Sequence, residues 1–398
     1  MDSNFKHIGY LIIVFIHLAK ANSDRYNGRE PLRDRDQDLQ AHSLQIHSMQ
    51  VHSFRVCSLQ VYSLQVLSLR VHRQMELRYG IIDENVKKRS VRDVILHERQ
   101  RIPVSKGGLP SGVASVPVMS GEKRAGELAV IAAVNDLAAQ GIRTTVFFPT
   151  ILLPAGTQEE FLRNLMKQIC RTAFSRGIDV REGRTEVTDL VRRPVVIGTA
   201  SGIPFFTAIR EEDNKIQNCR GMDIVMAGFA GLEGTFILAT EYEEELTDRF
   251  SGSLLYRIQK AGTELCIAEA AERAFFAGAG PMVSLAGGGV LAGLWELCKK
   301  TGCGMEVDLP LIPVLQETIE ITEYFGIGPY ALQSGGGLLI ASRDSESLVR
   351  TLSECGLYSV RIGRLTGTKD KILRNSEEIR HLDRPGADSL TKQCRSGK

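Results

Sequence analysis

The chain has 398 residues, of which 43% are hydrophobic and 24% are charged, with a formal net charge of +2. This length predicts two domains, and the composition is that of a globular protein that buries a core. Residues 1–74 carry nine Lys and Arg against six Asp and Glu, which leaves a net charge of −1 for residues 75–398. The even balance of charge excludes a strongly basic surface and argues against a nucleic-acid partner.

The first 74 residues differ from the rest of the chain. Lys6, the apolar run Ile8–Leu18 and the small residues around Ala21 resemble a secretory signal, and the run is too short to span a membrane. Residues His42–Val71 then repeat a pentapeptide whose apolar spacing suits neither a strand nor a heptad. We interpret residues 1–74 as a signal-like, low-complexity and disordered extension, with Met75 as the natural start of the folded chain.

Seven of the eight cysteines lie after residue 74, and none of them forms a C-x-x-C pair. Scattered cysteines on apparent helix faces are typical of reduced, buried thiols in a cytoplasmic protein. We therefore predict a cytoplasmic protein, with secretion as the alternative that the signal-like start supports.

The first domain, residues 75–215, is organised around the predicted helix Gly126–Arg143. Alanines and the spacing of its leucine and isoleucine favour a helix, and Gly141 provides a left-handed stop. Asn135 and Asp136 interrupt an otherwise apolar helix, where a buried carboxylate is costly unless it is paired or bound to a cation. These two residues are either the polar edge of a surface helix or part of a binding site.

The remaining elements of the first domain predict mixed α/β structure. The predicted strands are Thr144–Phe148, which Pro149 interrupts, Ile178–Glu182 and Pro194–Ala200. Thr157–Glu160 has the sequence of a capping box and predicts the start of a helix. Gly183–Val187 is expected to form a loop between two strands.

The second domain, residues 216–390, follows the charged connector Arg210–Asn218. Strand Asp223–Ala227 leads into a glycine-rich loop, and a second short strand leads into Gly287, Gly288 and Gly289 before the helix Val290–Lys300. A strand, a glycine turn and a helix start leave backbone N–H groups free for an anion. The alternative is a tight turn required only by close packing of the backbone.

Several motifs together are more specific than any one of them. They are N-D-L-A at 135–138, G-x-T-E-V at 183–187, G-L-E-G-T at 231–235, G-G-x-x-x-G-L-W-E-L at 288–297, G-x-E-V-D-L-x-x-I-P at 304–313, and F-G-I-x-P-Y with S-G-G-G-L-L-I at 325–340. Their order resembles the aminoimidazole-ribonucleotide synthase-related (PurM-like) superfamily, and most of all hydrogenase maturation factors of the carbamoyl-dehydratase (HypE-like) type. The resemblance covers roughly Met75–Leu390.

The resemblance implies an α/β (α+β) fold of two domains, in which the N-terminal domain dimerises and the C-terminal domain is α/β. It also implies that ATP and magnesium bind in a cleft between the domains and support phosphoryl transfer or ATP-dependent dehydration. Magnesium prefers hard oxygen ligands, so such a site needs several carboxylates.

The chain departs from the family at those carboxylates. Gly107–Ser115 contains no acid, the expected Thr-Asp-Pro is replaced by Ser115–Pro117, and Arg184 stands where the family has aspartate. Val283 and Ser284 replace a His-Asp pair. A guanidinium attracts phosphate oxygens but repels Mg²⁺, so metal binding is weakened.

Asp136 is the one acid of the first domain that matches the family's placement, and it is a weak magnesium candidate. The cysteine-ending tail that carries the transferred group in hydrogenase maturation factors is also missing, because Cys394 has different surroundings. No catalytic residue is assigned.

Three hypotheses follow. The first is an active ATP-dependent ligase, dehydratase or phosphotransferase with a remodelled site. The second is a degenerate relative, a pseudoenzyme candidate, that binds a nucleotide or phosphate ligand without metal or serves as a protein partner. The third is a secreted structural protein built on the repeat.

Under the first two hypotheses we expect a homodimer and one shared ligand site. The predicted nucleotide- or phosphate-binding residues are Asn135, Asp136, Arg184, Thr185, Glu186, Gly287, Gly288 and Gly289.

Overall fold

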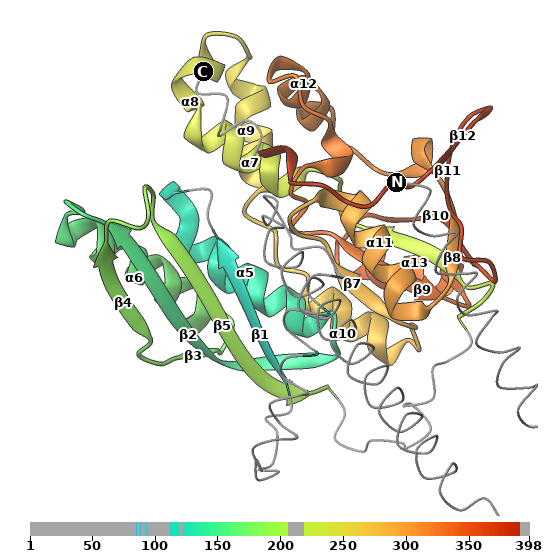
Figure 1. Cartoon of the computed structure of the whole chain (residues 1–398), viewed down its shortest axis with the longest axis horizontal. Helices are drawn as coiled ribbons and strands as arrows, with labels where there is room; N and C mark the ends of the chain where they lie inside the picture. The colour runs from blue at the N-terminus through green and yellow to red at the C-terminus, as the bar shows by residue number, and fades with distance from the viewer. Residues whose placement is uncertain are drawn as a thin grey trace, which may run out of the picture. The chain divides into compact units, whose positions relative to one another are not determined.

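The computed structural model in Figure 1 describes residues 112–118, 122–205 and 219–390, with the single residues 85, 88 and 93. The chain divides into two units, Met1–Leu77 and Arg78–Lys398. The first unit, which contains the signal-like segment and the repeats, lies outside the described residues. The predicted connector Arg210–Asn218 and Cys394 also lie outside them.

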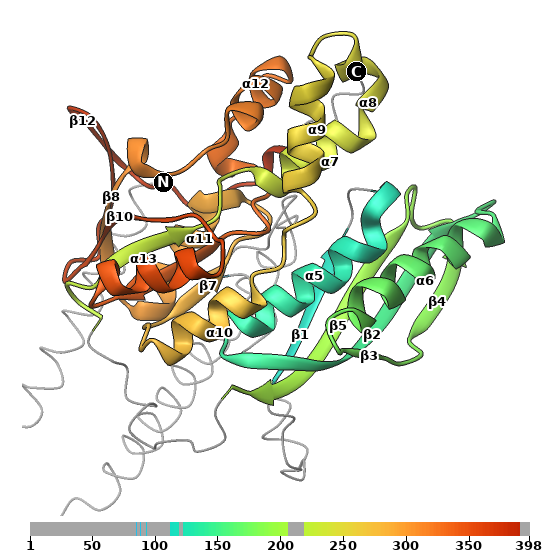
Figure 2. The ribbon, with the colours of Figure 1, turned by 180° about the vertical axis from the view of Figure 1, so that it is seen from behind.

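The first half of the described chain forms sheet A, with strand order β1–β5–β2–β3 and β4 also paired to β2. Its strands are β1 (Val113–Val118), β2 (Ile142–Pro154), β3 (Asp179–Val180), β4 (Arg184–Thr188) and β5 (Val195–Pro204). Strands β1, β5 and β2 are antiparallel, whereas β3 and β4 run parallel to β2. The helices α5 (Ala125–Ala138) and α6 (Glu159–Phe174) lie on one face, as the opposite views in Figures 1 and 2 show.

Alternation along the strands explains this arrangement. In β2, Phe147 and Ile151 are fully buried against the helices, while Phe148 between them is 36% exposed. Successive side chains of a strand point to opposite faces, so one face of sheet A packs on α5 and α6. The described helices leave the other face uncovered, and we call it the open face.

Three local expectations for sheet A need correction. Strand β2 continues through Pro149, which lies between the residues of β2 that pair with β3 and those that pair with β4. A missing N–H is tolerated at such a gap in the ladder. Residues 184–188, expected to be a loop, form strand β4. The capping box does not form, because α6 begins at Glu159 and the Thr157 hydroxyl donates instead to the Pro154 carbonyl.

The second half forms sheet B, with strand order β12–β11–β8–β10–β6–β9–β7. Its strands are β6 (Asp223–Ala227), β7 (Met282–Ser284), β8 (Gly304–Asp308), β9 (Leu338–Ser342), β10 (Ser359–Thr366), β11 (Lys371–Asn375) and β12 (Glu378–His381). Its helices are α7 (Leu232–Glu241), α8 (Glu243–Thr247), α9 (Gly252–Ala261), α10 (Ala268–Phe276), α11 (Gly289–Thr301), α12 (Gln316–Tyr324) and α13 (Ser345–Glu354), with the short 3-10 helices η5 (Leu309–Leu311) and η6 (Pro329–Ala331). The 3-10 helix η3 (Glu122–Arg124) belongs to the first half, directly before α5.

The central strands of sheet B, β6 and β9, are buried on both faces. Ile224 and Met226 of β6 pack in one cluster with Leu294 of α11. Val225, from the same strand, packs in another cluster with residues of α10 and α13, including Leu348. A strand that is covered on both sides needs apolar residues at every position, which explains the continuous apolar runs of β6 and β9.

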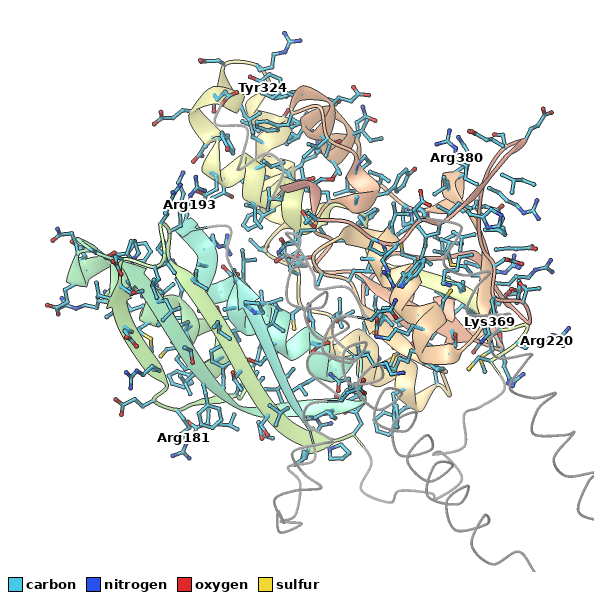
Figure 3. The ribbon with its side chains drawn as sticks, in the orientation of Figure 1. Arg181, Arg193, Arg220, Tyr324, Lys369 and Arg380 are labelled. Atoms are coloured by element: carbon cyan, nitrogen blue, oxygen red, sulfur yellow. The ribbon has the colours of Figure 1, made fainter. Side chains whose placement is uncertain are left out.

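Strands β11 and β12 form an antiparallel hairpin at the edge of sheet B. Glu378, His381 and their neighbours in β12 are all exposed, and Figure 3 shows Arg380 pointing away from the ribbon. Such a strand has no apolar face and gives no periodic signal. Among the described residues, no helix is long and apolar enough to cross a membrane.

Candidate functional site

Loops from several strands meet at one edge of sheet B. Strand β10 is antiparallel to both β6 and β8, and β9 is antiparallel to both β6 and β7, so β6, β7 and β8 run in one direction. The carboxyl ends of these strands therefore share an edge, which is where α/β proteins commonly bind ligands. We call the loops there, Gly228–Glu233, Gly287–Gly289 and Ser334–Gly337, the glycine edge.

Two helices start at the glycine edge with left-handed glycines. Gly231 (φ 70°) caps α7, and Gly288 (φ 81°) caps α11, a conformation that other residues adopt only with strain. The Gly231 N–H donates to Ser334 Oγ at 2.8 Å. At Gly289 an added side chain would collide with the Tyr330 and Leu332 carbonyl oxygens. The glycines thus serve both the turn and the close approach of the backbone.

A carboxylate of the chain itself lies at the N-terminus of α11. The Gly288 N–H donates to Asp388 Oδ2 at 2.6 Å, and Asp388 Oδ1 accepts from the Leu390 N–H at 2.8 Å. The positive end of the helix dipole and the free N–H groups favour an anion at this place. The predicted anion-binding turn therefore holds an anionic oxygen.

Glu233 is a second carboxyl group at the glycine edge, in the first turn of α7. It is 5% exposed, and its Oε2 accepts from the Gly335 N–H at 3.0 Å. Burial raises the pKa of Glu233 to about 7, with Asp388 adding to the rise and hydrogen bonds from Gln333 and Gly335 opposing it. Near neutral pH this carboxyl group is therefore only partly ionised.

Sequence reasoning missed Glu233 and Asp388. Glu233 belongs to the G-L-E-G-T motif, and an acid among small and apolar residues at a helix start was the available signal. The sequence around Asp388 contains no comparable signal, because the contact of Asp388 with Gly288 joins residues 100 positions apart.

Asn135 has a structural position inside the molecule. Its Nδ2 donates to the Leu265 carbonyl at 2.8 Å, and its Oδ1 accepts from the Ile267 N–H at 2.9 Å. The side chain is 3% exposed. It therefore joins α5 to the segment that precedes α10 and satisfies two backbone groups there.

Asp136 lies beside α11 rather than beside the glycine turn. Burial raises the pKa of the Asp136 carboxyl group, the nearby Lys300 opposes the rise, and Glu296 adds to it. Burial also lowers the pKa of Lys300, whose Nζ donates to the Met282 carbonyl at 2.9 Å. Lys300 lies in the last turn of α11, whereas Gly288 directly precedes the first turn. Because a helix of this length spans about 20 Å, Asp136 lies at the far end of α11 from the glycine turn.

No group of three or more His, Cys, Asp or Glu side chains within the described ranges could hold a metal ion. A lysine beside Asp136 would also repel a cation. Asp136 thus lacks the additional carboxylates that Mg²⁺ would need.

Arg184, Thr185 and Glu186 lie on β4, at the edge of sheet A opposite β1 (Figure 1). All three are exposed, and Arg184 Nη2 pairs with Glu186 Oε2 at 3.3 Å. Within the described part of the chain, no hydrogen bond or ion pair joins them to the glycine edge. The structure thus brings the turn 287–289 together with Glu233 and Asp388, and it does not bring the β4 residues to the same place.

Two family models match the chain. "AIR synthase related protein, N-terminal domain" matches residues 94–203, and "AIR synthase related protein, C-terminal domain" matches residues 234–374. Together they cover more than half of the sequence in the expected order. The chain belongs to the AIR synthase-related family. The predicted boundary between residues 215 and 216 falls between the two matches and remains a prediction.

Similar proteins come from hydrogenase maturation. Carbamoyl dehydratase HypE of Rhodobacter capsulatus is 26% identical over 56% of this chain and 63% of its own length, so this match spans less than two thirds of that relative. A hydrogenase expression/formation protein of Methanocaldococcus jannaschii is 25% identical over 68% of this chain and 78% of its own length.

A solved structure of hydrogenase maturation protein HypE in complex with ATP has a TM-score of 0.58, at 16% identity, over 73% of this AIR synthase-related chain and 90% of HypE. At that identity the likeness concerns the fold. The predicted PurM-like, two-domain α/β fold and the HypE-like resemblance are therefore confirmed.

Proposed function

We propose that this AIR synthase-related chain binds a phosphate-bearing ligand, such as a nucleotide, at the glycine edge. The observation that carries the proposal is the contact of the Gly288 N–H with a carboxylate oxygen, because a phosphate oxygen is chemically equivalent at that position. Two helix N-termini, those of α7 and α11, face the same edge. The ATP complex of the structurally similar HypE is in line with a nucleotide.

Binding without magnesium is the form of this function that the residues favour. Asp136 faces Lys300, and Glu233 is held by a backbone N–H, so neither is placed for a shared cation. This supports a degenerate, binding-only relative. ATP-dependent dehydration or phosphoryl transfer is the alternative, and it requires carboxylates from elsewhere.

We also propose a homodimer that pairs the open faces of two copies of sheet A. Along β1, β5 and β2 most residues of the open face are uncharged: Val113, Ser115, Pro117, Phe148, Thr150, Leu152, Val195, Ile197, Thr199, Ser201 and Ile203. Arg143, opposite Ile203, and Arg184 and Glu186 of β4, opposite Thr150 and Leu152, add charge at its margins. Val113 and Ile203 are each about half exposed, at 50% and 49%. A broad sheet surface that is uncharged at its centre and charged at its margins is typical of an interface between protein subunits.

The cysteines support a cytoplasmic location for the proposed dimer. In the described ranges, Cys170, Cys266, Cys298, Cys303 and Cys355 are free thiols, and Cys298 is buried. Reduced, unpaired thiols are the norm in reducing compartments. A further protein partner is proposed only as an alternative to ligand binding.

Calorimetric titration of the full chain with ATP, in EDTA and in Mg²⁺, tests the function. We expect the same dissociation constant in both, and weaker binding as the salt concentration rises. Binding that requires Mg²⁺ would overturn the metal-free form and favour the active enzyme.

Two glycine variants on α11 locate the site. Gly288→Ala should displace the N–H and abolish binding, because Gly288 has a φ of 81°. Gly302→Ala, at the other end of the same helix with a φ of 68° and open space around it, imposes the same backbone strain away from the site. Equal loss of binding in both variants would contradict a site at the turn.

A further inference from the structure

The C-terminal segment 382–390 crosses the glycine edge and is anchored at both ends. Leu382 is 8% exposed and packs in the cluster that contains Leu294 and Leu373, and Leu390 is 4% exposed in the cluster shared by α5 and α7. Asp383, Arg384 and Gly386 between the anchors are exposed. We call this segment the strap, since the buried Leu382 and Leu390 hold at its two ends a stretch whose middle is exposed or half-buried.

Asp388 is the residue through which the strap reaches the turn before α11. Its two carboxylate oxygens have different partners: Oδ1 accepts from Leu390 of the strap, and Oδ2 accepts from Gly288. The first contact lies within the strap itself, whereas the second joins the strap to the N-terminus of α11. A charged acceptor on a helix N-terminus makes a strong hydrogen bond.

A second carboxyl group, that of Glu233, lies near this contact. Asp388 contributes to the rise of the pKa of Glu233, so the two carboxyl groups lie close enough for their charges to interact. Like charges at this spacing repel. The two leucines and the Gly288 N–H thus hold the strap in place, whereas the negative charge of Glu233, when it is ionised, repels Asp388.

We propose that the strap is autoinhibitory: the Asp388 carboxylate occupies the place on the Gly288 N–H that a phosphate oxygen of the ligand would take. A phosphate group of the ligand takes the place of the Asp388 carboxylate on the Gly288 N–H, and the strap is released as the ligand binds. This inference rests on the proposed function, because it concerns the same turn.

The test compares Asp388→Ala with Asp383→Ala in the full chain, using calorimetry with inorganic phosphate and with ATP in EDTA. Asp383 belongs to the same strap and is exposed, so its removal controls for the lost charge. We expect Asp388→Ala to bind both probes more tightly, on the order of tenfold, because no internal anion competes. Asp383→Ala should bind like the wild type.

Hydrogen exchange of the strap gives a second readout that does not depend on affinity. Addition of phosphate should raise amide exchange at residues 386–390 in the wild type, and Asp388→Ala should show raised exchange without phosphate. Asp388→Asn keeps an acceptor oxygen for the Leu390 N–H, so it separates loss of charge from loss of the local turn. Its affinity should lie between those of the wild type and Asp388→Ala.

The outcomes distinguish autoinhibition by the strap from the function. Equal affinity in the wild type and Asp388→Ala, with strap exchange unchanged by phosphate, overturns the autoinhibition and leaves the ligand site standing. No binding of either probe by any variant overturns the proposed function. Binding that appears only in Asp388→Ala supports both.

Discussion

Sheet A and sheet B differ in how many of their faces are covered by helices. Along β2 the side chains alternate, so that Phe147 is fully buried and Phe148 is 36% exposed. Along β9 all five residues, Leu338–Ser342, are buried. Sheet A is therefore covered on one side and offers a face, whereas the central strands of sheet B are covered on both sides and offer only their edge.

This difference assigns separate roles to the two halves. A broad face suits contact with another protein subunit, and an edge with helix N-termini suits a small anionic ligand. The same contrast applies to the polar groups. Asn135, on the helix of sheet A, has its hydrogen bonds satisfied by backbone, whereas Glu233, beside sheet B, keeps a raised pKa and a carboxylate neighbour.

The largest expected effect separates the two faces of sheet A. Phe147→Ala should lower the free energy of unfolding by about 3–5 kcal/mol, because it opens a cavity in the core against α5. Phe148→Ala, at the next residue, should cost about 1 kcal/mol or less in the monomer. Urea denaturation measures both values.

The same pair tests the proposed dimer. Phe148→Ala should weaken dimerisation in analytical ultracentrifugation, because it removes apolar area from the open face. If Phe147→Ala and Phe148→Ala were equally destabilising and neither changed the dimer, the contrast between the two faces would be wrong.

The next effect concerns the pH dependence of Glu233. In the folded state its pKa is about 7, whereas the ordinary value is 4.5. Between these values the folded state binds more protons than the unfolded state, so stability falls as pH rises. Relative to Glu233→Gln, the wild type should be equally stable near pH 4 and less stable by about 3 kcal/mol above pH 7.

Urea denaturation at pH 4, 6 and 8 checks this pattern. The glutamine retains an oxygen that can accept from the Gly335 N–H, so the comparison isolates the charge. Glu244→Gln, at an exposed position of α8, is the matched control and should run parallel to the wild type at every pH. A constant difference between wild type and Glu233→Gln across this range would show that Glu233 does not titrate as described.

Much of the fold is visible in the sequence where local pattern and burial agree. The helix α5 and the strands β6 and β9 follow from continuous or periodic apolar residues, and the left-handed glycine before α11 follows from the glycine run. Strands β4 and β12 are exposed and charged, so nothing in their pattern distinguishes them from loops.

The candidate site was predictable only in part, for a different reason. The turn 287–289 has a local signature, but its partner Asp388 is 100 residues away in sequence. Asn135 was singled out as a polar residue in an apolar helix, and its partners, Leu265 and Ile267, are 130 and 132 residues away. A pattern can identify a residue that needs a partner, and only the fold identifies the partner.

A third, smaller effect is expected at Asn135. Asn135→Ala leaves the Leu265 carbonyl and the Ile267 N–H without their side-chain partner in a buried place, which should cost about 2 kcal/mol. Gln140→Ala, at an exposed position just after the same helix, should cost less than about 0.5 kcal/mol. Thermal unfolding of both variants measures the difference, and equal midpoints would show that the Asn135 contacts contribute nothing.

The smallest effect on stability is expected at Arg184. Its partner Glu186 is also exposed, and surface pairs contribute little, so Arg184→Asp should change the free energy of unfolding by about 0.5 kcal/mol or less. The sequence nevertheless predicts that this arginine binds phosphate and that Asp at this position shifts binding toward magnesium. Because β4 lies in sheet A and the glycine edge lies in sheet B, we expect the affinity for ATP in EDTA at low salt to be unchanged in Arg184→Asp. A dissociation constant raised several-fold, or a new dependence on Mg²⁺, would instead show that the edge of sheet A contributes to the ligand site, and the separation of roles between the two sheets would then fail.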